Sequence, residues 1–323
     1  MQQLERSTIS VVIPAFNSGK TIRATVDSVL AQTRPADEIL VLDDGSSDNT
    51  ASILASYGSP LRLIRQENRG AASSRNRLCR EARGDLIAFL DSDDLWHPAY
   101  LETQLRVLRE FPQASASFLG HISFIDDFTW PDVDLSAQLR TEHISALEFL
   151  SRYNKAPGAF SPCCCCVPKA SLEKLGDEPF QIPIAEDCYF YNRFPLLGPV
   201  LLSDIPLMAV RKRPGSLSSN RYRLSRDVVR VFESLEQEYV QKTDVTFQRV
   251  FFEMYALKRY VFSKILLHAG EDQEARVQLT KSFSMDKRWQ FRARVLAVLM
   301  SSYLPKNFRP DWLAKHPEWK ARS

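Results

Sequence analysis

The chain has 323 residues, of which 44% are hydrophobic and 25% are charged, the composition of a globular protein with a sizeable core. No stretch approaches the roughly 18 consecutive apolar residues that a membrane span needs. Residues 1–10 also lack the apolar segment of a secretory signal. We therefore expect a cytoplasmic protein, and we expect no nucleic acid partner.

The small net charge of +3 hides an asymmetry along the chain. Residues 205–323 carry 23 Lys and Arg against 12 Asp and Glu, whereas residues 1–204 carry 19 basic and 27 acidic residues. The acidic N-terminal part and the basic C-terminal part indicate two functional regions. The basic region is suited to binding phosphates or anionic lipid.

The front of the chain alternates strands with helices. Apolar runs predict strands at residues 10–13, 39–42, 61–64 and 86–90. Helical spacing of apolar residues predicts helices at residues 20–32, 48–57, 70–82 and 98–111, with Asp48 capping the second and Pro98 opening the fourth. Because the strand runs are continuous rather than alternating, both faces of the sheet should be covered. The pattern predicts a parallel, doubly wound α/β sheet.

Further strands and a helical region follow. Extended segments are predicted at residues 115–126, 161–167 and 200–210, whereas residues 129–159 are rich in turns and give no clear pattern. Beyond residue 222 the chain becomes helical, with helices predicted at residues 228–240, 247–268, 273–283 and 288–303. We place the boundary between the two regions near residues 219–222.

Four of the six cysteines are consecutive, from Cys163 to Cys166. Neighbouring residues of a strand point to opposite faces, so they are poor partners for one disulfide or one tetrahedral metal. Cys163 and Cys166 have the Cys-x-x-Cys spacing, but no second pair lies near them. We favour a buried strand of small apolar thiols, with metal or redox chemistry as the alternative.

The fourth predicted strand ends abruptly in Asp91, Asp93 and Asp94. An Asp-x-Asp at the tip of a strand can hold a divalent cation against an anionic ligand, because hard cations prefer oxygen ligands. In open α/β sheets, ligands bind outside the carboxyl ends of the strands. The alternative is a solvated acidic turn before the next helix.

Other strand ends add polar groups to the same edge of the sheet. The candidate residues there are Pro14, Ala15, Phe16, Asn17, Asp44, Asn68, Gly70 and Arg75. A carboxylate can accept hydrogen bonds from a base or a ribose, an arginine can contact phosphate, and a glycine allows close approach of the backbone. Together these groups provide what a nucleotide requires.

These motifs, taken in order, resemble those of the family 2 glycosyltransferases. The segments that carry the resemblance are residues 12–17, 28–33, 38–48, 68–70 with 75–76, 89–94 with Trp96 and Pro98, the pair Glu186-Asp187, and the loop 211–219. The resemblance implies a GT-A fold, a Rossmann-like, mostly parallel sheet flanked by helices, here with a C-terminal helical extension. It implies a catalytic domain at 1–220, with a nucleotide-binding half at about 1–126 and an acceptor half at about 127–220, followed by a helical region at 221–323.

The resemblance also implies roles for individual residues. Pro14 to Asn17 and Asp44 would hold the nucleoside, with Asp44 on the base, and Asn68, Gly70 and Arg75 would complete that pocket. Asp91 would hold ribose or metal-bound water, and Asp93 would bind Mg²⁺ or Mn²⁺ at the diphosphate. The loop bearing Arg211, Arg213 and Ser216 would close on the diphosphate.

Asp187 is the implied general base, and Glu186 would orient it or contact the acceptor. The alternative for this pair is the start of a helix, where acidic side chains complement the helix dipole. The chain departs from the family pattern at Arg213, where a histidine is usual, and at residues 183–185, where glycine is usual. The acceptor loop is therefore expected to have a different shape.

The implied function is that of an inverting, metal-dependent hexosyltransferase. It would move a sugar from a nucleoside-diphosphate sugar, with UDP favoured, to a hydroxyl of a glycan or lipid-linked acceptor in cell-surface polysaccharide biosynthesis. The basic C-terminal helices suggest peripheral contact with the inner face of the membrane. Two alternatives are a non-catalytic nucleotide-sugar binding or scaffold protein and a nucleotidyltransferase. The second is disfavoured because no Gly-rich, Lys-containing loop follows the first strand.

Overall fold

The computed structural model describes residues 7–59, 61–125, 127–133, 141–155, 165–212, 220–305 and 308–310. The chain divides into two compact units, Met1–Pro214 and Gly215–Ser323, which we describe separately. The boundary expected from the sequence falls a few residues beyond this division.

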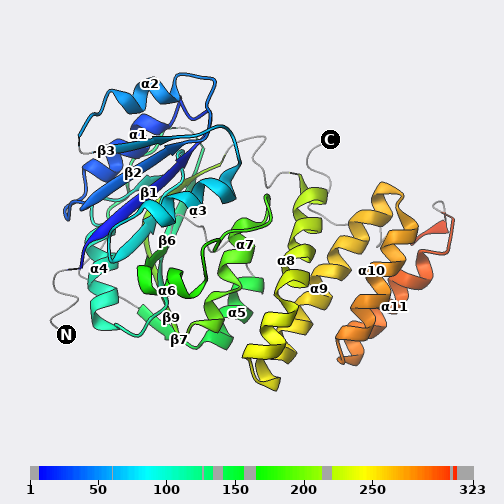
Figure 1. Cartoon of the computed structure of the whole chain (residues 1–323). Helices are drawn as coiled ribbons and strands as arrows, with labels where there is room; N and C mark the ends of the chain where they lie inside the picture. The colour runs from blue at the N-terminus through cyan, green and yellow to red at the C-terminus, as the bar shows by residue number, and fades with distance from the viewer. Residues whose placement is uncertain are drawn as a thin grey trace. The chain divides into compact units, whose positions relative to one another are not determined.

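The first unit begins with four parallel strands (Figure 1). These are β1 (Ile9–Ala15), β2 (Glu38–Asp43), β3 (Leu61–Arg65) and β4 (Leu86–Phe89), in the order β3-β2-β1-β4. The helices α1 (Ile22–Leu30), α2 (Thr50–Ala55) and α3 (Ala71–Glu81) make the crossovers. Val12 of β1 pairs with Leu40 on one side and Phe89 on the other, and all three are buried. The predicted α/β alternation is confirmed.

The sheet then continues with a change of direction. Strand β8 (Cys165–Pro168) runs antiparallel to both β4 and β6 (Ala116–Phe124), and β9 (Val200–Arg211) runs parallel to β6. The short strands β5 (Leu95–Trp96) and β7 (Thr141–Ile144) pair antiparallel with β9. Because β8 is antiparallel to both of its neighbours, β6 and β9 run the same way as β1 to β4. The carboxyl ends of these six strands therefore lie at one edge of the sheet.

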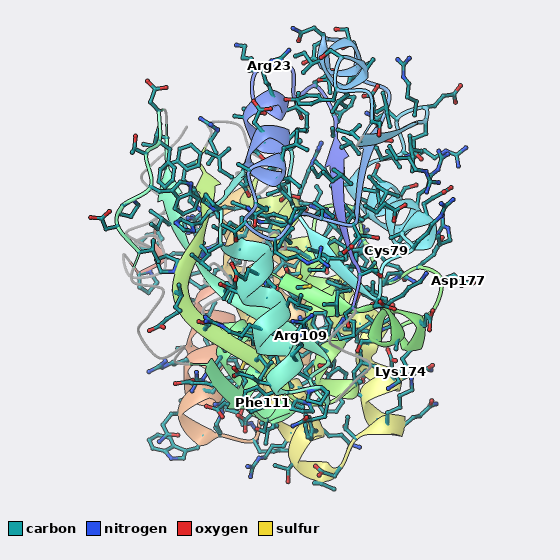
Figure 2. The ribbon with its side chains drawn as sticks, turned by 90° about the vertical axis from the view of Figure 1, so that its left-hand side faces the viewer. Arg23, Cys79, Arg109, Phe111, Lys174 and Asp177 are labelled. Atoms are coloured by element: carbon teal, nitrogen blue, oxygen red, sulfur yellow. The ribbon has the colours of Figure 1, made fainter. Side chains whose placement is uncertain are left out.

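Helices flank this sheet. Helix α4 (Tyr100–Glu110) packs on β6 and β9, and Figure 2 shows Arg109 at its C-terminal end, with α4 crossing the face of the sheet nearest the viewer. Helix α3 packs on β1 and β2. The Nη1 atom of Arg80 on α3 donates a hydrogen bond to the carbonyl oxygen of Asp177 at 3.2 Å. Helix α3 is thereby fixed to the segment that leads to the acidic pair.

Helices α1 to α4 each begin one or two residues later than predicted, and for α2 and α4 this changes the residue that opens the helix. The N-cap of α2 is Asn49, and Asp48 lies one residue earlier, with its Oδ1 accepting a hydrogen bond from the Thr50 N–H at 2.9 Å. Pro98 lies in the turn before α4, which begins at Tyr100. The region without a clear sequence pattern contains β7 and α5 (Ala146–Lys155).

The described cysteines of the consecutive run, Cys165 and Cys166, are fully buried in β8 and unbonded to each other. Burial raises the pKa of the Cys166 thiol to about 12, so this thiol stays protonated and is a poor nucleophile and metal ligand. The expected buried strand of thiols is confirmed for these two residues. Cys163 and Cys164 lie outside the described residues.

The described part of the second unit contains four α-helices, which Figure 1 shows side by side in chain order. They are α8 (Arg221–Lys242), α9 (Val245–Ala269), α10 (Asp272–Met285) and α11 (Trp289–Ser301). Asp244 caps α9 by accepting from the N–H groups of Thr246 and Phe247, and Gly270 ends it in the left-handed conformation. The predicted helical region is confirmed. Within the described residues, no helix has the length and apolar character to cross a membrane.

Candidate active site

The loops that follow β1, β2 and β4 are joined by hydrogen bonds. The Asp44 N–H after β2 donates to the carbonyl oxygen of Ala15 at 2.8 Å. The hydroxyl oxygens of Ser18 and Ser92 lie 2.6 Å apart, which joins the loop after β1 to the acidic turn after β4. The structure thus brings the predicted loops together at the carboxyl edge of the sheet, as parallel strands require.

The loop after β1 contains the exposed ring of Phe16 and the side-chain amide of Asn17, which is hydrogen-bonded within the protein. Phe16 is about half exposed, so its ring is accessible at this edge. Asn17 has a positive φ of 48°, and its Oδ1 accepts a hydrogen bond from the Ser47 N–H at 2.9 Å. The amide of Asn17 therefore shapes the loop, whereas Phe16 has a free surface for a ligand. Pro14 is half-buried and Ala15 is buried at the end of the strand.

Asp44 is buried and fixes the entry to α3. Its carboxylate accepts hydrogen bonds from the N–H groups of Arg69 (2.9 Å) and Gly70 (2.8 Å) and from Nε2 of Gln66 (2.7 Å). A carboxylate offers about four acceptor positions, and three of those of Asp44 are used within the protein. Asp44 was expected to contact the base, and in this structure it positions the loop that also carries the exposed Asn68.

Two glycines in these loops have left-handed backbone conformations. Gly45 has a φ of 73°, and a Cβ there would lie 2.8 Å from the backbone nitrogen of Asn68. Gly70, the N-cap of α3, has a φ of 86° and open space around its Cα. At position 45 the nearby backbone of Asn68 leaves no room for a Cβ, so glycine is required there. At position 70 there is room for a side chain, and glycine is favoured only by the left-handed conformation.

Arg75 lies at the centre of the candidate site. Its side chain is almost fully buried on α3. Its Nη2 lies 2.6 Å from Oδ1 of Asp91, and its Nη1 lies 2.7 Å from Oε1 of Glu186. The guanidinium thus joins two carboxylates that are distant in sequence. It was expected in the nucleoside pocket, and the structure places it between the acidic turn and the acidic pair.

Asn76, next to Arg75, fixes the segment that precedes the acidic pair. Its Nδ2 donates to the carbonyl oxygen of Phe180 at 2.8 Å, and its Oδ1 accepts from the N–H of Phe180 at 2.9 Å. We gave Asn76 no role from the sequence, although it is part of the motif on α3. The sequence did offer one indication. Asn76 is a polar residue on a helix that packs on the sheet, and a buried polar side chain needs a hydrogen-bond partner.

Glu186 and Asp187 form the first turn of α7 (Glu186–Tyr191). Glu186 is buried, whereas Asp187 is half-buried, with its Oδ1 accepting from the Cys188 N–H at 2.7 Å. The pair therefore lies at the start of a helix, as the alternative interpretation held. This position is compatible with the catalytic role that the family resemblance implies. Acidic side chains complement the N-terminal dipole, and Arg75 connects Glu186 to Asp91.

The acidic pair has raised pKa values. Burial raises the pKa of Glu186 to about 7, opposed by Arg75 and reinforced by the negative charges of Asp187 and Asp91. Burial also raises the pKa of Asp187, opposed by the hydrogen bond from the Cys188 N–H and by Arg75. A raised pKa makes a carboxylate a stronger base, which suits proton transfer near neutral pH.

Glu186 should make the stability of the protein depend on pH. The carboxyl of Glu186 has a pKa of 4.5 in the unfolded chain and of about 7 in the folded protein. Between pH 4.5 and about pH 7, the folded protein therefore keeps a proton that the unfolded chain has lost. The free energy of unfolding should therefore fall as pH rises through this window, by at most about 3 kcal/mol. Melting temperatures at pH 5 and pH 7 measure this change, and Glu186→Gln should remove most of it. A variant with the same pH dependence as the native chain would assign the effect to another group.

The turn after β4 is tied to the end of β9. Asp94 is buried, and its Oδ1 accepts from the backbone N–H of Arg211 at 2.8 Å. The Nε of Arg211 donates to the carbonyl oxygen of Asp93 at 3.1 Å, and its guanidinium lies 4.4 Å from the ring centroid of Phe124. Sequence reasoning gave Asp94 no role, and the structure makes it the link between these segments. The other predicted loop residues, Arg213 and Ser216, lie outside the described residues.

The acidic turn has a donor set that fits Mg²⁺ or Mn²⁺. Within the described ranges, no group of three or more His, Cys, Asp or Glu side chains is placed so that it could hold a metal ion without other ligands. Mg²⁺ commonly takes only one or two carboxylates from the protein and completes its shell with water and substrate phosphates. Asp91 and Asp93, on one turn at the carboxyl edge, offer that number of ligands.

Comparison with known proteins identifies the family. Residues 10–176 match the model of glycosyl transferase family 2, which is about half of the chain. The chain belongs to glycosyltransferase family 2. It is 39% identical over 125 residues to the putative teichuronic acid biosynthesis glycosyltransferase TuaG of Bacillus subtilis, covering 38% of this chain and 49% of TuaG.

A second relative is WfgD of Escherichia coli, named as a UDP-Glc:α-D-GlcNAc-diphosphoundecaprenol β-1,3-glucosyltransferase. It is 37% identical over 129 residues, which cover 38% of this chain and 51% of WfgD. The chain thus spans about half the length of these two curated relatives.

The crystal structure of S. aureus TarS residues 1–349 in complex with UDP-GlcNAc has a similar fold. It superposes with a TM-score of 0.68 at 21% sequence identity, covering 91% of this chain and 84% of that chain. At this identity the likeness concerns the fold alone. The GT-A fold expected for this family 2 member is confirmed.

Proposed function

We propose that this protein is an inverting, metal-dependent glycosyltransferase that moves a sugar from a UDP-sugar to a hydroxyl of a glycan or lipid-linked acceptor. The observation that carries the proposal is the ion pairing of Arg75 with Asp91 and Glu186. It joins the turn that would face the diphosphate to the pair of acids that would face the acceptor. Such a junction is what transfer between two substrates requires.

Asp187 is the residue we assign as general base. It is next to the buried Glu186 but more accessible, and its pKa is raised toward neutrality. A hydroxyl that attacks the anomeric carbon must lose its proton as the new bond forms, and a positioned carboxylate can accept that proton. A single base on the acceptor side fits one in-line displacement, and therefore inversion of the anomeric configuration.

Glu186 and Arg75 act as positioning residues in this mechanism. The ion pair with Arg75 fixes Glu186, and Glu186 lies in the same helical turn as Asp187. Arg75 also fixes Asp91 through its second amino group. Asp91 and Asp93 would hold Mg²⁺ or Mn²⁺, which would stabilise the negative charge on the departing nucleoside diphosphate. Phe16 offers an exposed ring on which a base can stack.

The comparisons support the choice of donor and acceptor class. TarS has been crystallised with UDP-GlcNAc and with UDP, and WfgD is named for a UDP-Glc donor and a diphosphoundecaprenol-linked sugar. TuaG is named for teichuronic acid biosynthesis. We therefore extend to this chain a UDP-sugar donor and a surface polysaccharide, with a lipid-linked sugar diphosphate as the first acceptor to test.

A panel of nucleotide sugars tests the proposal directly. The full chain is incubated with Mn²⁺, each donor and a sugar-diphosphate lipid, and the release of UDP is measured with and without acceptor. Acceptor-dependent release of UDP together with a glycosylated product supports transfer, and NMR of the new linkage reports inversion. Binding without any turnover would favour a binding or scaffold protein, and release of pyrophosphate would favour a nucleotidyltransferase.

Replacing Asp93 tests the metal site. Asp93→Ala should abolish the Mn²⁺-dependent part of UDP binding while the melting temperature stays near that of the native chain, because Asp93 is half-exposed. Isothermal titration of UDP with and without Mn²⁺ measures this. The matched control is Asp204→Asn, an exposed acid on β9, which should bind as the native chain does. Unchanged Mn²⁺-dependent binding of Asp93→Ala, or full activity in EDTA, would end the metal assignment.

A further inference from the structure

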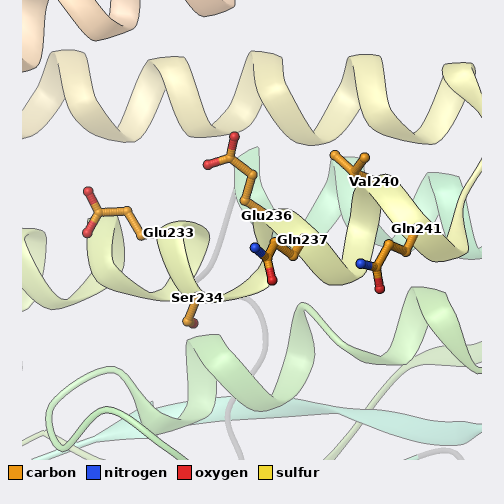
Figure 3. Close-up of a pocket in the computed structure, with 6 residues that line it drawn as sticks. All are labelled: Glu233, Ser234, Glu236, Gln237, Val240 and Gln241. Atoms are coloured by element: carbon orange, nitrogen blue, oxygen red, sulfur yellow. The ribbon is translucent and has the colours of Figure 1, made fainter.

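The four-helix unit has two surface features that the proposed reaction does not use. One is a hollow along α8 lined by six residues of that helix, drawn in Figure 3: Glu233, Ser234, Glu236, Gln237, Val240 and Gln241. Its side chains are mostly polar, and Glu233 is paired with Arg259 at 2.8 Å. The other feature is an exposed apolar stripe on α11, and it is the more informative of the two.

The stripe consists of Trp289, Ala293, Leu296 and Met300, which are all exposed. They are spaced by four, three and four residues, so they lie on one face of the helix. Trp289 is 73% exposed and Met300 is 65% exposed. Tyr303, just beyond the helix, extends the same exposed surface. Single exposed apolar residues are ordinary, but an aligned set with a tryptophan marks an interaction site.

The opposite face of α11 is already used for packing. Phe291, Val295 and Val298 are buried, and the ring of Phe291 lies 5.7 Å from the ring of Tyr260 on α9. Helix α11 is therefore apolar on two sides, although only one side contributes to the core of the unit. Packing within the unit does not explain the exposed stripe, so a partner outside the unit is needed to cover it.

Charge indicates what that partner is. Residues 287–310 contain six Lys and Arg and no Asp or Glu. Two of these cations, Lys287 and Arg294, are exposed on or beside α11, whereas the exposed Arg288 is paired with Asp286 and Glu253. An apolar stripe with tryptophan at its end and flanking cations is the pattern of a helix that lies in the interface of an anionic bilayer. A two-fold contact centred on the stripe would instead bring Arg294, near the middle of α11, close to the same residue of the other copy.

We propose that α11 binds an anionic membrane surface, with the stripe in the headgroup region and the cations at the lipid phosphates. The helix has 13 residues, and within the described residues no helix can cross a membrane, so it would lie on the surface. The inference stands on the helical unit alone and does not depend on the transfer reaction. Such binding would hold the enzyme at the surface where a lipid-linked acceptor is found.

Flotation of the full chain with vesicles tests the proposal. Vesicles of phosphatidylglycerol and phosphatidylcholine should carry the protein upward at about 0.1 M NaCl, whereas phosphatidylcholine alone should not, and high salt should weaken the association. Leu296→Gln with Met300→Gln should lower the vesicle-bound partition coefficient by about ten-fold or more, because two apolar side chains no longer enter the interface. Arg294→Glu should lower it by at least about five-fold.

Two matched controls make the test specific. Val245→Gln changes a residue on α9 that is 80% exposed, and Arg223→Glu reverses an exposed charge on α8. Both should bind vesicles as the native chain does, and melting temperatures should show that all variants are folded. The proposal is overturned if the native chain does not associate with phosphatidylglycerol, or if the α11 variants bind as the controls do. It is also overturned if light scattering shows a dimer that only the stripe variants disrupt, without any flotation.

Discussion

Asp187→Asn is expected to lower the rate of sugar transfer by a factor of about 10²–10⁴, the usual contribution of a general base. Asparagine keeps the size of the side chain, and its Oδ1 can still accept from the Cys188 N–H, as the carboxylate does at 2.7 Å. It cannot accept the proton of the acceptor hydroxyl. Steady-state kinetics should show the loss in kcat, with the affinity for the donor nearly unchanged.

The control for this variant is Asp177→Asn, which alters an exposed acid of the same unit (Figure 2). It should retain native kinetics. If Asp187→Asn turns over nearly as fast as the native chain, the base is another carboxylate, and Glu186→Gln would then show the large loss. In native protein, kcat/KM should decline toward acidic pH as Asp187 is protonated, at a pH above its ordinary value because its pKa is raised.

Arg75→Met is expected to have the largest effect on stability. Methionine fills much of the space, but it leaves Glu186 and Asp91 without their shared cation. Above about pH 7, where Glu186 is ionised, removing one partner of this buried ion pair costs about 3 kcal/mol or more, because the remaining charge is buried without compensation. Urea denaturation should show this loss of unfolding free energy, and transfer should also fall because the two segments are no longer joined.

Two further variants separate this effect from a general loss of charge on α3. Arg77→Met, on the same helix, removes a half-buried arginine whose Nη1 donates to a carbonyl and an amide oxygen, and it should cost about 1 kcal/mol or less. Adding Glu186→Gln to Arg75→Met should recover part of the stability, because the uncompensated acid is then neutral. Equal losses for Arg75→Met and Arg77→Met would contradict the central position of Arg75.

The position of the site could be predicted from the sequence because parallel strands place their carboxyl ends at one edge. Asp44, Asp91 and Phe16 each follow an apolar run, and the structure brings their loops together as expected. The roles of single side chains were harder to predict. A carboxylate or guanidinium beside a strand end can bind a ligand or another loop, and only tertiary contacts decide which, as for Asp44.

Other features had no sequence pattern that could predict them. A short apolar run such as Cys165 to Val167 does not reveal whether it pairs parallel or antiparallel, so the reversal of direction at β8 was not foreseen. Strand β5 has only two residues, too few for any periodicity. The pairing of Arg75 with Glu186 joins residues 111 positions apart, a separation over which local patterns carry no information.

The pairing of β8 between β4 and β6 has a consequence for synthesis on the ribosome. The order β3-β2-β1-β4 can form from the first part of the chain, but β4 then has an unpaired edge made of four buried apolar residues. That edge stays open to association with other nascent chains until β8 emerges. Glu186 emerges later still, so Arg75 acquires its second carboxylate only when the sheet is nearly complete. Chains that stop before residue 165 would carry the loops after β1, β2 and β4 on an aggregation-prone fragment.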